Sequence, residues 1–347
     1  MSGPTGPSPP PSAVTRAIGA LVLGRALSRP EAEAAMQALL GDDLDAAGAG
    51  ALLATMAIRG ITAPALAGFA TVMRQHAVTV PGGLDAFDTC GTGGSGLPTL
   101  NTSTLAAFVL AAAGVRVAKH GNRASSGRCG SMDVLEHLGV DIELDLPRAT
   151  ARLADGLVFL NARRHHPALG PLAAVRRSVG VRTIFNLLGP LCNPAGVGRQ
   201  LLGVSDVAAA PLLAETLAAL GCARALVVHG DGGLDELALS GPTRVWRVEG
   251  DRIEAGVVTP EDAGLPVHPF EDIIGGTPEE NARDFNALLD GTPSAYRDAV
   301  LLNSAAALVV ADAASDLKAG VEMARHSIDS GAARDKITQV ARITQTA

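Results

Sequence analysis

From residue 84 onward, short apolar segments alternate with stretches of helical length, and this alternation limits the folds open to the chain. The apolar segments are residues 86–88, 115–118, 157–160 and 225–228. The stretches between them, such as 103–113 and 206–220, have the length and composition of helices. Parallel strands need helical crossovers, so this pattern predicts an α/β domain with a largely parallel sheet.

The residues before this pattern are predicted to be helical. Apolar residues recur with helical spacing through residues 13–78, and Ser28, followed two positions later by Pro, is a typical helix start. Residues 1–12 are mainly Pro, Gly and Ser and are expected to form a disordered tail. A helix within 171–193 is expected to pack back on the first helices.

These patterns predict the domain boundaries. The helical domain covers residues 13–80 and is joined by a later segment of about 170–200. Residues 81–169 and 201–347 then form the α/β domain. Three further features are expected: a hairpin of strands 246–248 and 252–255, a break at Gly189 and Pro190, and a helical stretch over 299–325.

The composition describes a globular protein and argues against several functions. Of the 347 residues, 47% are hydrophobic and 18% are charged, with a net charge of -7. A nucleic-acid-binding protein needs a broad basic face, which this acidic balance does not favour. The four cysteines lack zinc-ligand spacing, and we see no secretory leader and no apolar run of ~18–20 residues. We therefore expect a cytoplasmic protein with neither nucleic acid nor membrane as a partner.

Between Asp88 and Asp133 the chain has no Asp or Glu, and this stretch concentrates groups that bind phosphate. It contains glycines at 91–96, hydroxyl and amide residues at 101–104, and a basic segment at 119–123. Its four cations are Arg116, Lys119, Arg123 and Arg128. Glycines let backbone N–H groups approach an anion, and a helix N-terminus adds a favourable dipole. The stretch predicts an enzyme that acts on a small molecule carrying several phosphates.

The glycines at 91–96 also match the dinucleotide pattern G-x-G-x-x-G. A dinucleotide site needs a helix that opens directly from the glycines and an acid about 20 residues further on. Here Pro98 intervenes and the following region is basic, which disfavours a dinucleotide. A plain glycine-rich turn is the structural alternative, and residues 101–104 are also expected to act as an N-cap cluster.

A second glycine-rich turn follows the apolar segment 225–228 and presents Asp235 and Glu236 side by side. Mg²⁺ prefers one or two carboxylates together with substrate phosphates and water, so this pair predicts a magnesium site. An ordinary acidic turn is the alternative, and Asp231 is a weaker candidate ligand.

The adjacent residues His165 and His166 raise the question of a metal. Neighbouring side chains on one strand or helix point in different directions. The pair is therefore expected to position groups or line a pocket rather than bind zinc.

Several motifs in order resemble those of the anthranilate phosphoribosyltransferases. They lie at residues 88–96, 101–104, 119–136, 166–168, 175–190, 235–244 and 297–307. The similarity runs from about residue 14 to the C-terminus and is far more specific than one glycine loop. Pyrimidine-type nucleoside phosphorylases share the architecture that the family implies but match these motifs less well.

The resemblance implies a small helical domain hinged to a larger α/β domain with a largely parallel central sheet, usually in a homodimer. It also implies Mg²⁺-dependent transfer of phosphoribose from phosphoribosyl pyrophosphate (PRPP) to the amine of anthranilate, an early step of tryptophan synthesis. No catalytic side chain is expected, since an aromatic amine is already a nucleophile and the barrier is departure of pyrophosphate.

The family pattern assigns roles to individual residues. Ser103, Asp235 and Glu236 would serve Mg²⁺, and Arg176 would pair with the carboxylate of the acceptor. The full set of candidate substrate-binding residues is Gly91, Gly94, Ser95, Thr99, Asn101, Thr102, Ser103, Thr104, Lys119, His120, Gly121, Asn122, Arg123, Ser125, Ser126, Gly127, Ser131, His166, Arg176, Gly189 and Pro190.

The chain departs from the family pattern near the expected site. Ser95 replaces a usual Asp, Gly127 and Met132 replace Ser and Ala, and Asn161 and Arg163 replace Phe and Pro. These changes leave open a paralogue that uses a different aromatic acceptor. A non-catalytic nucleic-acid-binding relative is a third hypothesis, which the net charge and the intact acidic pair disfavour.

Overall fold

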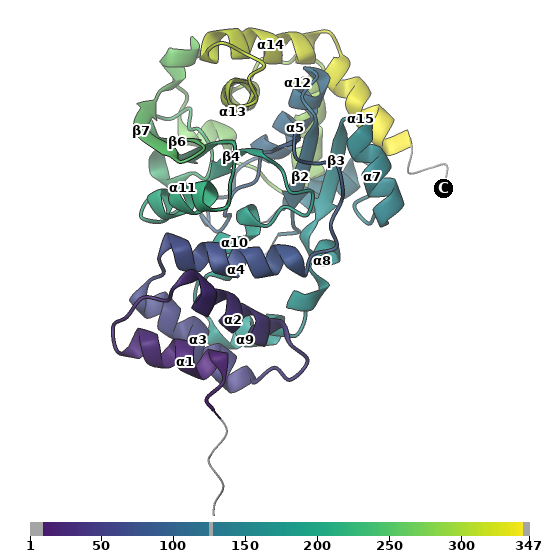
Figure 1. Ribbon diagram of the computed structural model, residues 1–347. Coiled ribbons are helices and arrows are strands. Elements are labelled where there is room, and N and C mark those ends of the chain that lie inside the picture. Colours follow the sequence, from purple (N-terminus) through teal and green to yellow (C-terminus); the bar gives the residue numbers. More distant parts are fainter. Residues whose placement is uncertain (1–9, 125–127, 343–347) are drawn as a thin grey trace, which may run out of the picture. The chain divides into compact units, whose positions relative to one another are not determined.

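The computed structural model describes residues 10–124 and 128–342 (Figure 1). The chain divides into two compact units: the smaller contains the residues up to His76 and Ala168–Leu188, and the larger contains Ala77–Pro167 and the residues from Gly189 on. Residues 189–200, which the sequence groups with the helical domain, fall in the larger unit. Nowhere in the described ranges is a helix long and apolar enough to cross a membrane.

The smaller unit is helical. Its helices are α1 (Ala13–Val22), α2 (Arg29–Leu40), α3 (Ala46–Arg59), α4 (Ala63–Gln75) and α9 (Leu172–Val179). Ser28 begins α2 with a capping box, because its hydroxyl accepts from the N–H of Glu31 while Glu31 accepts from the N–H of Ser28. Helix α2 packs on α4 and α9 packs on α3, so the later segment closes the bundle that the first four helices begin.

Among the described residues of the larger unit, seven strands form one sheet in the order β3-β2-β1-β4-β5-β6-β7. The strands are β1 (Phe87–Asp88), β2 (Val117–Gly121), β3 (Leu157–Asn161), β4 (Arg199–Gly203), β5 (Arg224–His229), β6 (Thr243–Glu249) and β7 (Arg252–Val258). The first five are parallel, and β5, β6 and β7 pair antiparallel. The expected α/β fold and hairpin are confirmed, while the sequence analysis missed β4.

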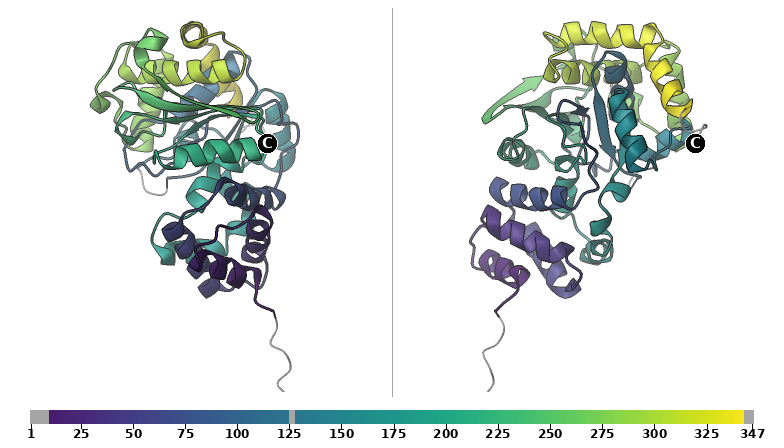
Figure 2. Two further views of the ribbon diagram at one scale, coloured as in Figure 1. Left: turned by 60° about the vertical axis from the view of Figure 1, so that its left-hand side comes forward. Right: turned by 45° about the vertical axis from the view of Figure 1, so that its right-hand side comes forward.

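The helices of the larger unit flank this sheet. They are α5 (Thr102–Ala112), α6 (Ser131–His137), α7 (Leu146–Ala154), α8 (Ala162–His165), α11 (Ala209–Ala219), α12 (Pro278–Leu289), α13 (Ala295–Val310), α14 (Leu317–Asp329) and α15 (Ala332–Arg342). Figure 2 shows α11 and the C-terminal helices on opposite faces of the sheet. The helical stretch expected over 299–325 is two helices, which a turn at Asp312 with φ of 61° separates.

Helix α10 (Phe185–Leu191) contains the boundary between the units. The break expected at Gly189 and Pro190 is wrong, since Pro190 lies inside the last turn of this helix. Proline supplies no N–H for an i→i−4 hydrogen bond, and the helix ends one residue later.

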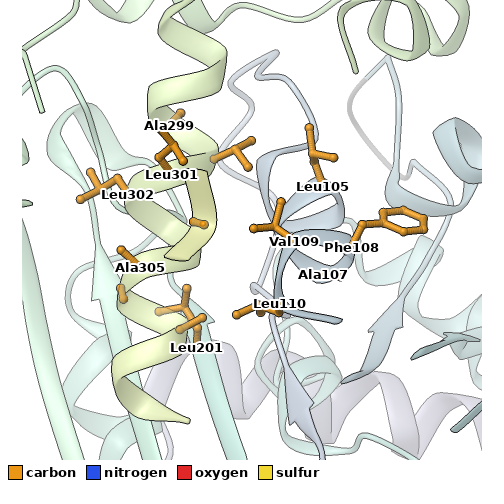
Figure 3. Packing of buried hydrophobic residues seen from close by; sticks show 14 of the residues in the cluster. Leu105, Ala107, Phe108, Val109, Leu110, Leu201, Ala299, Leu301, Leu302 and Ala305 are labelled. Carbon is orange, nitrogen blue, oxygen red and sulfur yellow. The ribbon is translucent and has the colours of Figure 1, made fainter. Parts of the chain in front are cut away.

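The core of the larger unit is divided between the two sheet faces. On one face, Leu105 and Phe108 of α5 pack with the α13 residues shown in Figure 3. The Phe108 ring lies 5.0 Å from that of Phe159 in β3. The β3 neighbours of Phe159, Val158 and Leu160, join a second cluster, as the alternation of side chains along a strand requires. Burial on both faces fixes the strands whose ends carry the polar residues described below.

Candidate active site

The predicted site residues gather where the strand order changes direction. Strands β2 and β3 lie on one side of β1, and β4 and β5 lie on the other. Ligands of open α/β sheets bind at the carboxyl ends of strands beside such a switch point. Beyond the end of β1, Gly91 forms a parallel bridge with Gly203, the last residue of β4.

The glycine loop, residues 89–97, follows β1 and turns its backbone toward β4 and β5. The N–H of Thr92 donates to the Gly203 carbonyl at 2.8 Å, and the N–H of Gly93 donates to Asp235 Oδ2 at 2.9 Å. Gly93 and Gly94 have φ values of 61° and 73°, which favour glycine. A Cβ on Gly91 would lie 2.8 Å from Asp235 Oδ2, so the loop approaches the acidic residues closely.

Helix α5 begins shortly after this loop, and a residue distant in the sequence caps its N-terminus. Asn101 occupies the N-cap position without a side-chain cap bond. Instead, Glu236 Oε1 accepts from the N–H of Ser103 at 3.2 Å, and the Thr102 hydroxyl also bonds Glu236. The N-cap role predicted for the side chains of 101–104 is therefore wrong at Asn101. A carboxylate from a distant turn of the same unit satisfies the helix end.

The side chain of Asn101 is held by other residues. Its Oδ1 accepts from Asn281 Nδ2 at 3.0 Å and from Cys129 Sγ at 3.3 Å, and its Nδ2 donates to the Cys129 carbonyl at 3.4 Å. Asn281 in turn accepts from the N–H of Gly276 at 2.7 Å. The amide of Asn101 is thus oriented by the segment that begins α12.

The acidic loop, residues 230–236, follows β5 and carries the predicted magnesium ligands. Asp235 and Glu236 border a cavity of about 50 Å³ that Gly91 and Ser103 also line. Burial and the neighbouring Asp235 raise the pKa of Glu236 to about 8. A cation between these carboxylates would relieve both effects. The described residues hold no cluster of three or more His, Cys, Asp or Glu side chains fit for a metal, so further ligands would have to come from substrate or water.

Lys119 and Asp88 are both buried beneath the glycine loop, and the charge of Lys119 acts on Asp88 without a direct ion pair. Lys119 Nζ donates to the Thr89 carbonyl at 2.8 Å. Asp88 accepts from the N–H of His120 at 3.1 Å and from Asn193 Nδ2 at 2.7 Å. Burial raises the pKa of Asp88 to about 6, although Lys119 and these donors oppose the shift. The pair joins the ends of β1 and β2 and places a positive charge under the loop.

One cation of the segment after β2 already forms ion pairs with acidic residues of the protein. Arg123 pairs with Glu136 at 2.5 Å and with Asp133 at 3.4 Å. Arg116 precedes β2 and pairs with Asp85 at the opposite end of the strand, so it does not join the cations at the carboxyl end. Arg128 is exposed. Ser125, Ser126 and Gly127 lie outside the described residues.

Backbone contacts order the rest of this segment. Ser131 Oγ donates to the Asn122 carbonyl at 3.2 Å, and a Cβ on Gly121 would overlap Ser131 Oγ. Within the glycine loop, Ser95 Oγ accepts from the N–H of Leu97 at 3.3 Å. Thr99 bridges to Ile274 through its backbone.

His120 and His166 form a buried pair whose rings lie 5.4 Å apart. The Nδ1 of His120 donates to the Gly189 carbonyl at 3.1 Å, and Nε2 of His166 donates to the Cys192 carbonyl at 3.0 Å. Burial is the main cause that lowers their pKa values, to about 3 for His120 and about 4 for His166. Both rings are therefore neutral at pH 7. His120 Nε2 and His166 Nδ1 are buried and have no hydrogen-bond partner among the described residues.

The remaining predicted residues are placed as follows. The carbonyl of Pro190 accepts from Gln200 Nε2 at 2.8 Å in the larger unit. Arg176 belongs to the smaller unit, where its guanidinium lies 5.0 Å from the centre of the Phe185 ring. Thr104 is buried, and its hydroxyl finds no hydrogen-bond partner in the described part of the chain.

Two departures from the family pattern have structural roles. The Asn161 side chain accepts from the N–H of Arg163 at 3.2 Å to cap α8, and it donates to Glu143 at 2.7 Å. Met132 is fully buried in the core beside α5. The side chain of Arg163 is exposed.

The sequence analysis missed several residues that shape the site. Gly203 is the last residue of β4 and Ser205 follows it, and Ser205 Oγ donates to the Gly93 carbonyl at 3.0 Å. Asn303 of α13 bonds the backbone next to Glu236. The apolar run before Gly203 is an unused signal for β4. Asn303 lies within the family-like segment 297–307, but nothing in that segment predicts its contact with the acidic loop.

Comparison with known proteins places this architecture in one class. A model described as "Glycosyl transferase family, helical bundle domain" matches residues 15–77, and "Glycosyl transferase family, a/b domain" matches residues 83–334. The chain is similar to an anthranilate phosphoribosyltransferase from Anaeromyxobacter sp. (strain K), with 49% identity over 95% of this chain and 98% of the relative. It is 46% identical to that of Desulforudis audaxviator, over 96% of each. The chain belongs to the anthranilate phosphoribosyltransferase family.

Solved structures agree with this placement. The anthranilate phosphoribosyltransferase from Thermus thermophilus matches with a TM-score of 0.90 and 41% identity, over 95% of this chain and 99% of that one. The Saccharomyces cerevisiae enzyme "in complex with PRPP and Mg" matches with a TM-score of 0.86 and 26% identity, over 96% and 98%.

Proposed function

We propose that this protein transfers the phosphoribosyl group of PRPP to the amine of anthranilate, giving N-(5-phosphoribosyl)anthranilate and pyrophosphate in tryptophan biosynthesis. The observation that carries the proposal is the meeting of the glycine loop, the N-terminus of α5 and the acidic loop at the switch point of the sheet. Relatives of this name match nearly the whole chain at about half identity, which supports the same reaction.

The donor's phosphates would be held mainly by backbone groups. Gly91 and Gly94 would contact the donor through the backbone, the start of α5 adds a helix dipole, and Lys119 adds a positive charge below the loop. Further proposed contacts are the hydroxyls and amides of Asn101, Ser103, Thr104, Asn122, Ser126 and Ser131. The backbone groups of the glycine loop are fixed before the ligand arrives, so they can stabilise charge without a large cost of reorganisation.

Asp235, Glu236 and Ser103 are the residues that would hold Mg²⁺. They fit the ion because two adjacent carboxylates and a hydroxyl line one small cavity, and a positive charge there would offset the causes that raise the pKa of Glu236. When bound, Mg²⁺ would neutralise the pyrophosphate as it leaves. The S. cerevisiae structure with PRPP and Mg supports magnesium as the ion.

The acceptor would need orientation rather than deprotonation. His120 and His166 are neutral and buried, and among the described residues each has a ring nitrogen that is unpaired and can accept a hydrogen bond. We propose that these rings, with Gly189 and Pro190, line the path of anthranilate, and that Arg176 pairs with its carboxylate. A neutral lining keeps the aromatic amine unprotonated and nucleophilic.

Asn161 gives no support to a different acceptor, because its side chain already caps α8 and bonds Glu143. We also propose that the enzyme acts as a homodimer, as the family resemblance implies, and that it acts in the cytoplasm, as the scattered cysteines suggest. Light scattering on the purified protein tests the first of these two points.

The reaction is tested by loss of anthranilate fluorescence with PRPP and Mg²⁺. We expect rapid loss that requires Mg²⁺, and about a hundredfold slower turnover in Glu236→Gln. Asp231→Asn is the matched control, since Asp231 lies in the same loop but is exposed and accepts from the Ser240 hydroxyl. Wild-type protein that binds PRPP by calorimetry yet leaves anthranilate unchanged would contradict the proposed acceptor.

A further inference from the structure

A buried asparagine of α13 grips the backbone immediately after the acidic pair. Asn303 Oδ1 accepts from the N–H of Leu237 at 2.9 Å, and Asn303 Nδ2 donates to the Leu237 carbonyl at 3.1 Å. The same amide nitrogen donates to the Ala299 carbonyl of its own helix at 3.0 Å. Only 3% of Asn303 is exposed, and the residue also borders the cavity that Asp235 and Glu236 line.

We propose that Asn303 is a positioning residue that sets the location of Asp235 and Glu236 for metal and PRPP binding. The proposal rests on the function proposed above and adds a residue to its machinery. Asn303 acts through the backbone of Leu237, the residue after Glu236, rather than by touching the reacting atoms.

Close backbone contacts also hold the acidic loop on its other sides, up to the residue that Asn303 binds. A Cβ on Gly203 would overlap the Asp235 carbonyl, and a Cβ on Gly230 would overlap the Glu236 carbonyl. Asp235 also accepts from the N–H of Gly93. The loop therefore lies directly against β4 and the glycine loop, and Asn303 fastens the residue where it leaves the site.

The pairing of Asn303 with Leu237 is specific to an amide. One side-chain amide satisfies both the donor and the acceptor of a single residue, as a neighbouring strand would do. If this amide is replaced by an apolar group, both buried backbone groups of Leu237 lose their partners. The segment would then shift to find new ones, and the carboxylate of Glu236 would move with it. Residues behind metal ligands typically change metal affinity about 10- to 100-fold when they are altered.

The test compares Asn303→Leu with Leu308→Ala. Leucine keeps the approximate size of asparagine but cannot form the three hydrogen bonds. Leu308 is fully buried in the same helix, and its side chain has no group that could bond the acidic loop, so Leu308→Ala reports on a general loss of packing. Binding of Mn²⁺ in the presence of PRPP is followed by electron paramagnetic resonance. Half-saturation by Mg²⁺ and the KM values for PRPP and anthranilate are measured in parallel.

We expect Asn303→Leu to weaken Mn²⁺ binding and raise the Mg²⁺ half-saturation about 10- to 100-fold, with the KM for anthranilate unchanged. Leu308→Ala should lower the melting temperature while leaving both metal constants at the wild-type values. If Asn303→Leu does not fold, Asn303→Ser, which can pair with only one group of Leu237, should show a smaller shift in the same direction. Metal constants equal to those of the wild type in a folded Asn303 variant would overturn the proposal.

The same experiment separates this proposal from the proposed function. If the wild-type protein binds Mn²⁺ with PRPP but does not consume anthranilate, only the proposed acceptor is contradicted. The change in the metal constants of Asn303→Leu then still tests the positioning role. A wild-type protein that binds no Mn²⁺ with PRPP overturns both.

Discussion

Glu236 of the acidic loop and the histidine pair lie beside the same switch point, yet removal from water moves their pKa values in opposite directions. It raises the pKa of Glu236 and lowers those of His120 and His166, so each group is pushed toward its neutral form. Around Glu236 a second carboxylate adds to the shift, which a bound cation would reverse. Around His120 the neighbouring rings and Lys119 oppose a further positive charge, and neutrality suits an uncharged aromatic amine. The acidic loop is suited to bind a cation, whereas the histidine pair disfavours a positive charge.

The largest loss of activity is expected when the acidic loop is forced away from β4. Gly203→Ala would drive a methyl group into the Asp235 carbonyl, so the acidic loop must move by more than a side chain can absorb. We expect kcat/KM to fall by at least about a hundredfold, because a misplacement of about 1 Å is enough for that loss. Steady-state kinetics with PRPP measures it. Gly19→Ala, where a Cβ meets nothing within 4 Å, is the control and should leave activity unchanged.

Asp88 connects the two sides, since it accepts from the N–H of His120 and lies in the field of Lys119. Asp88→Asn would remove the negative charge near Lys119 and turn an amide against Asn193, so a buried donor would lose its acceptor. We expect a loss of about 1–3 kcal/mol in the free energy of unfolding, measured by urea denaturation. Asp85→Asn, which alters an exposed pair, should cost less than about 1 kcal/mol. Equal losses in both variants would contradict the importance of the buried Asp88 carboxylate.

The histidine side predicts how stability depends on pH. The pKa values of His120 and His166 lie below the unfolded value of 6.5, so their contribution is present above pH 6.5 and is lost as the pH falls toward 4. The raised pKa values of Asp88 and Glu236 act in the opposite direction, because the folded protein holds these protons more tightly than the unfolded chain. The total slope is therefore shallow, and the histidine part is isolated by comparison with a variant.

That variant is His166→Gln, compared with the wild type by urea unfolding at several pH values. One titrating ring is worth at most about 1.4 kcal/mol per pH unit, and the unfolded ring is only partly protonated near its pKa. We expect the wild type to lose about 1 kcal/mol relative to the variant between pH 6.5 and 5.5. Parallel pH profiles for the two proteins would mean that the charge on His166 is tolerated in the folded state.

The smallest effect is expected at the far end of β2. Arg116 pairs with Asp85 on the surface, away from the carboxyl ends of the strands. Arg116→Ala should change stability by less than about 1 kcal/mol and leave the KM for PRPP unchanged. A raised KM would return Arg116 to the group of phosphate-binding cations that the sequence suggested.

Local patterns in the sequence are enough to predict much of the molecule. The alternating apolar segments predict the parallel sheet, and the acid-free stretch and the pair Asp235 and Glu236 stand out by composition and spacing. These signals are local, because glycines and carboxylates are needed at the ligand itself. Strand β4 was missed since its short apolar run resembles a buried helix segment.

The supports of the site could not be found in this way. Glu236 caps α5 across 133 positions, and Asn303 reaches Leu237 across 66. Asn101 turns from its own helix to Asn281, which lies 180 positions away. Such contacts depend on how the elements pack, and a single sequence carries no local trace of them.

The distant cap of α5 also affects how the protein folds during its synthesis. During synthesis α5 leaves the ribosome well before Glu236 is added to the chain. The N–H of Ser103 in its first turn therefore lacks the acceptor that it has in the folded protein. Strand β1 likewise waits for β4 on one side. While only the first half of the domain has been made, the contacts that hold the glycine loop are missing. The glycine loop therefore reaches its final conformation only after the acidic loop has been translated.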